Sequence, residues 1–73
     1  MKSRTEITEY ARKIMAGYQD WQVLSELDYP HDARRNIEII RAAIRKEFGC
    51  SGAVANTAIA HVLRERRAAR KEN

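Results

Sequence analysis

Cysteine, proline and glycine are all scarce in this sequence. The 73 residues include one cysteine, one proline and three glycines. A single cysteine cannot form an internal disulfide, and it lacks the second thiol of a Cys-x-x-Cys site. So few turn-forming residues leave little room for the tight turns that connect β-strands. Because 44% of the residues are hydrophobic and 33% are charged, the composition is that of a globular protein. We therefore expect an all-α fold.

Long apolar runs are also missing. No stretch approaches the roughly 18 consecutive apolar residues that a membrane-spanning helix needs, and the first residues show no apolar segment typical of a signal peptide. The lone cysteine suits a reducing compartment. We therefore expect a cytoplasmic protein without a membrane partner.

Residues able to carry catalysis or to hold a metal are few. Cys50 is the only thiol, and His31 and His61 stand far apart in the sequence. Neither histidine has another Cys or His close by to build a zinc site, and no third group orients a Cys–His pair for nucleophilic catalysis. The segment from Gly49 to Gly52 is too short to cradle phosphates. We expect no catalytic residue, no metal, no cofactor and no small-molecule substrate, and so a protein that is not an enzyme.

Apolar residues recur every three or four positions through most of the chain, which predicts amphipathic helices. We expect a helix from about Arg4 to Ala16 that Gly17 ends, a short helix capped by Asp20, a helix from near Pro30 to Phe48, and a last helix after Ser51. These form a compact bundle of four helices. Its predicted core, to which we expect Trp21 to contribute most, is Ile7, Ile14, Trp21, Leu24, Leu27, Ile37, Ile40, Ile44, Phe48, Val54, Ile59 and Val62.

Charge is divided unevenly along the chain. The net charge is +4; residues 1–32 carry four basic and six acidic side chains, whereas residues 33–73 carry ten basic and four acidic ones. After Leu63 the apolar pattern stops. We expect residues 1–63 to form a single helical domain and the basic tail 64–73 to fray. A chain polarised in this way is expected to bind a charged partner with its second half.

The stretch from Phe48 to Leu63 resembles the helix-turn-helix of bacterial and phage repressors. Gly49, Ala58 and Ile59 are typical occupants of their positions in that family. The resemblance implies a helix-turn-helix-like pair at the C-terminal end of the bundle, with its second helix in the major groove of DNA. Gly52 and Ala53 depart from the pattern, because longer polar side chains usually stand there to contact base edges.

Eight residues of the last helix and its cap are the candidates for contact with nucleic acid or with another partner. Polar side chains near the start of the helix would face base edges, and basic ones further along would face phosphates. The candidates are Ser51, Asn56, Thr57, His61, Arg64, Arg67, Arg70 and Lys71.

In size, charge and helix-turn-helix-like block the chain resembles the small transcription regulators encoded by phages, and it is similar in character to the RNA-polymerase-binding inhibitors and antiterminators of Xanthomonas phages. That resemblance implies a protein partner, the host RNA polymerase, competition with the σ factor, and action in the host cytoplasm. Three hypotheses follow. In the first, the protein docks on polymerase, inhibits transcription initiation and promotes antitermination. In the second, it is a repressor that recognises DNA through Ser51 to His61, and in the third it is an anti-host protein that binds another bacterial target.

Overall fold

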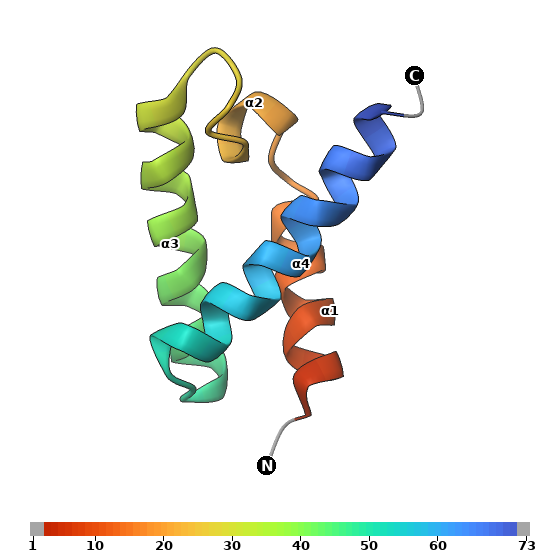
Figure 1. Ribbon diagram of the computed structural model, residues 1–73. Helices are drawn as coiled ribbons and strands as arrows, with labels where there is room; N and C mark the ends of the chain where they lie inside the picture. Colours follow the sequence, from red (N-terminus) through yellow and green to blue (C-terminus); the bar gives the residue numbers. More distant parts are fainter. Residues whose placement is uncertain (1–2, 72–73) are drawn as a thin grey trace.

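The computed structural model describes residues 3–71, with the side chains of residues 3–70, and it is helical throughout with short connections. Four helices follow one another along the chain (Figure 1): α1 (Arg4–Met15), α2 (Asp20–Val23), α3 (Pro30–Phe48) and α4 (Gly52–Lys71). The part of the chain that is described contains no strand. The predicted all-α bundle is confirmed.

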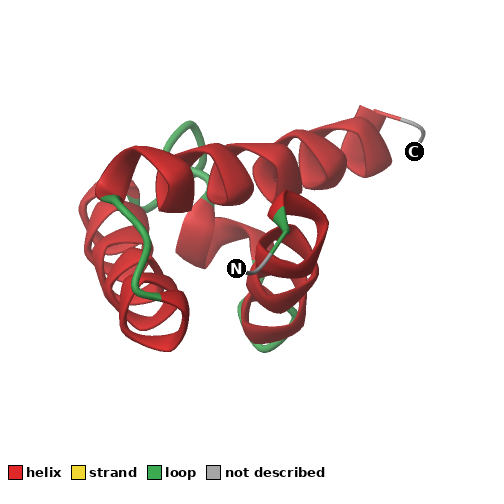
Figure 2. Ribbon diagram, turned by 90° about the horizontal axis from the view of Figure 1, so that it is seen from below, coloured by secondary structure: helices red, strands yellow, loops and turns green. Residues whose placement is uncertain are grey.

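The helices are arranged in two layers. α1 and α3 lie in one layer, and α4 crosses over both of them (Figure 2). The short α2 packs against α3 at the end of the layer where α1 finishes (Figure 1). α4 therefore contacts both the first and the third helix, and it closes the core from one side.

Local signals explain where α1 and α2 begin and end. The hydroxyl of Ser3 accepts a hydrogen bond from the backbone N–H of Glu6 and so caps α1. α1 ends at Met15, slightly before the predicted end, and Gly17 is not in the left-handed conformation expected of it. Gln19, and not Asp20, is the N-cap of α2, and the Gln22 side chain accepts a hydrogen bond from the Gln19 backbone N–H at 2.7 Å.

The corner between α3 and α4 follows its predicted chemistry. Pro30 is the first residue of α3, where its missing N–H costs nothing. Gly49 ends α3 with a φ of 64°, a left-handed conformation that favours glycine. The hydroxyl of Ser51 then accepts from the N–H of Val54 and caps α4. The three residues 49–51 thus join two helices that meet at a steep angle (Figure 1).

The core lies where α4 crosses the other layer. Of the predicted core residues, six are buried, and five are partly buried and pack against the buried cluster. Trp21 is 40% exposed, so the prediction that it contributes most to the core is wrong. The core is completed by residues that lie on the same helical stripes but are missing from the predicted list. These additional buried residues are Ala11, Met15, Val23, Ala33, Ala55 and Ala58.

α4 does not stop where the apolar pattern stops. The helix continues without a break from Leu63 to Lys71, through the segment expected to fray. Arg66 supplies the physical reason, because its side chain is only 19% exposed and its guanidinium donates hydrogen bonds to Asp20 and to the carbonyl of Met15. The second half of α4 is therefore held against the body of the protein by polar contacts, where the first half is held by apolar ones.

Candidate functional site

The predicted contact residues lie along α4 and its cap, and all those with described side chains are exposed. Lys71 ends α4, and its side chain lies outside the described part of the structure. The other predicted contact residues do not form one surface that is free to bind a partner. Several of them already form hydrogen bonds or ion pairs with other groups of this chain, so that only the rest are available to a partner.

Two of the predicted base-contacting hydroxyls are used within α4 itself. The Ser51 oxygen accepts the hydrogen bond of the Val54 N–H at 3.2 Å. The Thr57 hydroxyl donates to the carbonyl of Ala53, one turn earlier, at 3.0 Å. Because Gly52 and Ala53 have no polar side chain, Asn56 is the only residue of this first stretch with an exposed polar group that makes no hydrogen bond among the described residues.

Two of the predicted phosphate contacts already form ion pairs with carboxylates of this chain. Arg67 donates two hydrogen bonds to Glu26, and Arg70 lies 3.5 Å from Asp20, which it shares with Arg66. We call Asp20, Glu26, Arg66, Arg67 and Arg70 the ion-pair cluster. It pairs three arginines on the second half of α4 with two carboxylates and joins that helix to the segment around α2.

His61 and Arg64 differ in their surroundings. His61 lies 3.4 Å from Glu65 on the next turn, and Glu65 accepts a two-pronged hydrogen bond from Arg12 of α1. That bond is the main cause lowering the pKa of Glu65 and raising the pKa of Arg12. Arg64 is exposed and has no ion pair among the described residues. Of the predicted basic contacts with described side chains, only Arg64 is therefore free to bind a phosphate without breaking an existing pair.

Glu26 makes the ion-pair cluster sensitive to pH. The hydrogen bonds from Arg67 lower the pKa of Glu26 from its ordinary value of 4.5 to about 2. Because the folded-state pKa lies below the unfolded one, the stabilisation is complete above pH 4.5 and is lost as the pH falls toward 2. The side chain is 46% exposed, so we expect the size of a surface pair, about 0.2 to 1 kcal/mol. The Glu26→Gln variant should melt below the parent at neutral pH and together with it near pH 2.

The matched substitution for this test is Glu47→Gln. Glu47 is exposed and forms no ion pair with a described residue, so its replacement should leave the pH dependence of melting unchanged. A melting difference between Glu26→Gln and the parent that persists undiminished near pH 2 would show that Glu26 does not stabilise the fold through its charge.

An exposed aromatic pair was missed by the sequence patterns. Trp21 of α2 and Tyr29, just before α3, pack edge to face with ring centroids 5.1 Å apart, and they are 40% and 55% exposed. Trp21 also lines an open cleft of about 480 Å³. Acidic, basic and apolar side chains border this cleft: Tyr18, Gln19, Asp20, Leu27, Asp28, Arg66 and Arg70. Since α2 is only one turn long, periodicity could not indicate which of its sides faces the core.

Two further properties bear on the kind of site present. In the described residues no helix is apolar over enough of its length to cross a bilayer, and no three of their His, Cys, Asp or Glu side chains gather into a potential metal-binding group. Comparison with family models, with characterised proteins and with solved structures finds no match to this chain. The candidate site therefore rests on the chain's own geometry, that of an exposed aromatic pair beside a network of ion pairs.

Proposed function

We propose that this protein is a small non-enzymatic transcription regulator of phage origin that binds host bacterial RNA polymerase and inhibits transcription initiation. Competition with σ factor is the proposed route of inhibition, and promotion of antitermination is proposed as a second activity. The observation that carries the protein-binding part is the exposed Trp21–Tyr29 pair beside the arginines of α4. Tryptophan, tyrosine and arginine are the residue types that contribute most at protein–protein interfaces.

The state of the basic residues supports a protein partner over DNA. A repressor needs free cations to neutralise phosphates, whereas Arg67 and Arg70 are paired with Glu26 and Asp20. The link to transcription is supported by the helix-turn-helix-like corner between α3 and α4 and by the resemblance to phage regulators. Such a protein acts by occupying a surface of the enzyme and shifting its population of states, without chemistry of its own.

A DNA-binding repressor is the second candidate. The steep corner at Gly49 and the free side chains of Asn56 and Arg64 favour it. If Asn56 contacts a base, its replacement by alanine should weaken binding to one preferred sequence only, by about 1 to 3 kcal/mol. An equal loss on random DNA would exclude base recognition.

The decisive experiment is capture of RNA polymerase from a nuclease-treated lysate of the host bacterium by the tagged protein. We expect polymerase to be retained after the DNA is removed. We further expect Trp21→Ala to weaken binding to purified polymerase at least tenfold, since truncating an aromatic residue at an interface hot spot costs about 2 kcal/mol or more.

The matched substitution is Ile39→Ala, which truncates another exposed hydrophobic side chain, on α3. It should leave polymerase binding unchanged. Retention of polymerase only in untreated lysate, together with DNA fragments of a recurring sequence, would favour the repressor. Equal binding by Trp21→Ala and the parent would remove the aromatic pair from the interface.

A further inference from the structure

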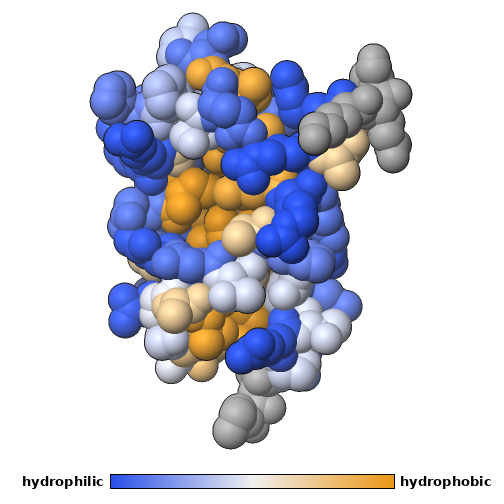
Figure 3. All heavy atoms as spheres, in the orientation of Figure 1, coloured by the Kyte–Doolittle hydropathy of each residue, from blue (hydrophilic) through white to orange (hydrophobic). Residues whose placement is uncertain are grey.

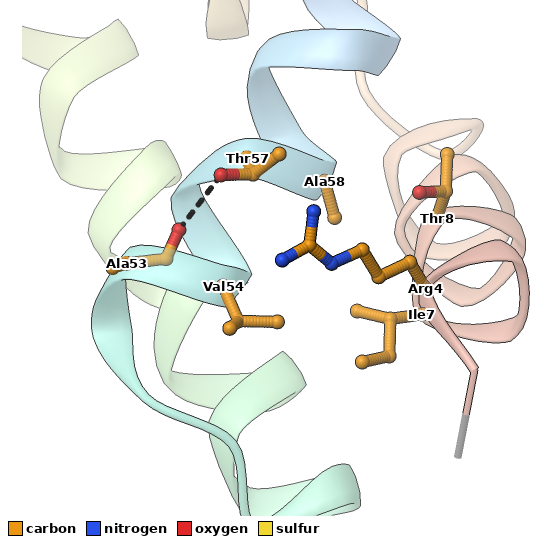
Figure 4. Close-up of a pocket in the computed structure, with 7 residues that line it drawn as sticks. All are labelled: Arg4, Ile7, Thr8, Ala53, Val54, Thr57 and Ala58. Carbon is orange, nitrogen blue, oxygen red and sulfur yellow. Dashed lines mark hydrogen bonds between the residues drawn. The ribbon is translucent and has the colours of Figure 1, made fainter.

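A second feature of the surface is a small apolar pocket between α1 and α4. Figure 3 shows apolar residues exposed in two places beside α4, one on the α3 side and one on the α1 side. The α1 side holds a pocket of about 150 Å³, lined by the first two turns of both helices (Figure 4). Its lining residues are Arg4, Ile7, Thr8, Ala53, Val54, Thr57 and Ala58. A volume of this order accommodates a group the size of benzene or of a leucine side chain.

The pocket differs from the hollow on the α3 side in its charge. That hollow is bordered by Arg34, Glu38 and Arg67, so both signs are present in its wall. In the α1–α4 pocket Arg4 is the only charged lining residue. Its guanidinium reaches across the pocket toward α4 (Figure 4), and it forms no ion pair with a described residue. An unpaired cation beside an apolar floor is complementary to an apolar group that carries a carboxylate.

The position of Arg4 is not explained by helix stability. It is the first residue of α1, where the helix dipole disfavours a cation. The first turns of α1 and α4 both face the pocket, so the partial positive charges of two helix ends add to the charge of Arg4. Arg4 and the two helix ends therefore favour an anion beside this pocket.

We propose that the α1–α4 pocket binds an aliphatic side chain of leucine size from an acidic segment of the protein partner, with a neighbouring carboxylate of that segment paired to Arg4. The aliphatic group would contact Ile7, Val54 and Ala58, and the carboxylate would accept hydrogen bonds from the guanidinium. This inference rests on the proposed function only in taking the occupant from a protein partner. It adds a second, chemically distinct contact to the aromatic pair, on another part of the surface.

The first test uses N-acetyl-leucine as the probe, because it combines the aliphatic side chain with a carboxylate, and uncharged N-acetyl-leucinamide as its matched control. In an NMR titration of the ¹⁵N-labelled protein, we expect saturable shifts at Ile7, Thr8, Val54 and Thr57. Binding of the amide should be about five- to tenfold weaker, since it lacks the charge-assisted hydrogen bonds. Equal binding of both probes, shifts confined to another surface, or the absence of saturable shifts would overturn the proposal.

Variants of α1 separate the charge of Arg4 from any general effect of charge. Arg4→Gln should weaken N-acetyl-leucine binding to the level of the amide, whereas Arg4→Lys should retain part of the difference. Lys13→Gln removes the same charge from an exposed position further along α1 that does not line the pocket, and it should have no effect. If Arg4→Gln and Lys13→Gln lower the affinity for N-acetyl-leucine equally, the carboxylate is attracted by the overall charge of α1 and is not bound at Arg4.

Polymerase binding distinguishes this proposal from the proposed function. If both hold, Arg4→Gln weakens polymerase binding and Lys13→Gln does not. Weakening by Trp21→Ala without any by Arg4→Gln would overturn the pocket as a partner site and leave the proposed function standing. Saturable binding of N-acetyl-leucine by a protein that does not retain polymerase would support the pocket's chemistry and refute the polymerase as the partner.

Discussion

Replacing Ile44 by alanine is expected to lower the free energy of unfolding by about 2 to 5 kcal/mol. Ile44 lies on α3, is fully buried, and belongs to the cluster that α1, α3 and α4 form together. Truncation removes three carbons from this cluster and leaves a cavity that surrounding helices fill only in part. In a domain of this size, such a loss is a large fraction of the total stability. Urea denaturation followed by circular dichroism measures it directly.

Ile39→Ala is the matched substitution for this prediction. It makes the same chemical change on the same helix, at a side chain that is 53% exposed. Its effect should stay within about 0.5 kcal/mol. If both variants unfold at the same urea concentration, the stripe of α3 that carries Ile44 does not face the core, and the packing described above is wrong.

Replacing Arg66 by alanine should destabilise the protein by about 1.5 to 3 kcal/mol, the range for hydrogen bonds to charged groups. The Arg66 guanidinium bonds the Asp20 carboxylate at 2.7 Å and also the carbonyl of Met15, at the end of α1. Alanine keeps the helical propensity of α4 but removes both of these bonds, so that Asp20 keeps only Arg70 at 3.5 Å and the Met15 carbonyl keeps only the Tyr18 N–H. We therefore also expect the amides beyond Leu63 to lose protection from hydrogen exchange, which tests whether this segment frays when it is released.

Arg64→Ala provides the comparison, because Arg64 lies on the same helix, is exposed and has no ion pair among the described residues. Stability and amide protection should both remain near those of the parent. Equal amide protection in Arg66→Ala and Arg64→Ala would show that Arg66 does not hold the second half of α4. A double substitution with Asp20→Ala should lose less than the sum of its single effects, since the two side chains share one interaction.

The sequence allows the helices to be predicted because their signals are local. Apolar periodicity over α1, α3 and the first half of α4 defines their buried faces, while Pro30, Gly49 and Ser51 each act within one turn of the helix end they define. These signals need no knowledge of the rest of the chain. The corner between α3 and α4 was predictable for the same reason.

The candidate site is less predictable because it depends on contacts between distant residues. Arg67 and Glu26 are separated by 41 positions in the sequence, and Arg66 and Asp20 by 46. In the sequence, the basic segment after Leu63 has too few acidic neighbours to pair its charges, and so it suggests an unpaired tail. The carboxylates that pair with it belong to the first half of the chain. Trp21 shows a second limit, because a hydrophobic residue on a one-turn helix can face either the core or the solvent.

The crossing of α4 over α1 also has a consequence for the order in which this protein can fold. Four buried residues of the core, Ala55, Ala58, Ile59 and Val62, belong to the last helix, and that helix packs chiefly on the first. During synthesis, α1 emerges well before the helix that covers it. The nascent chain therefore completes its core only once α4 has left the ribosome, so that the four helices fold as one unit.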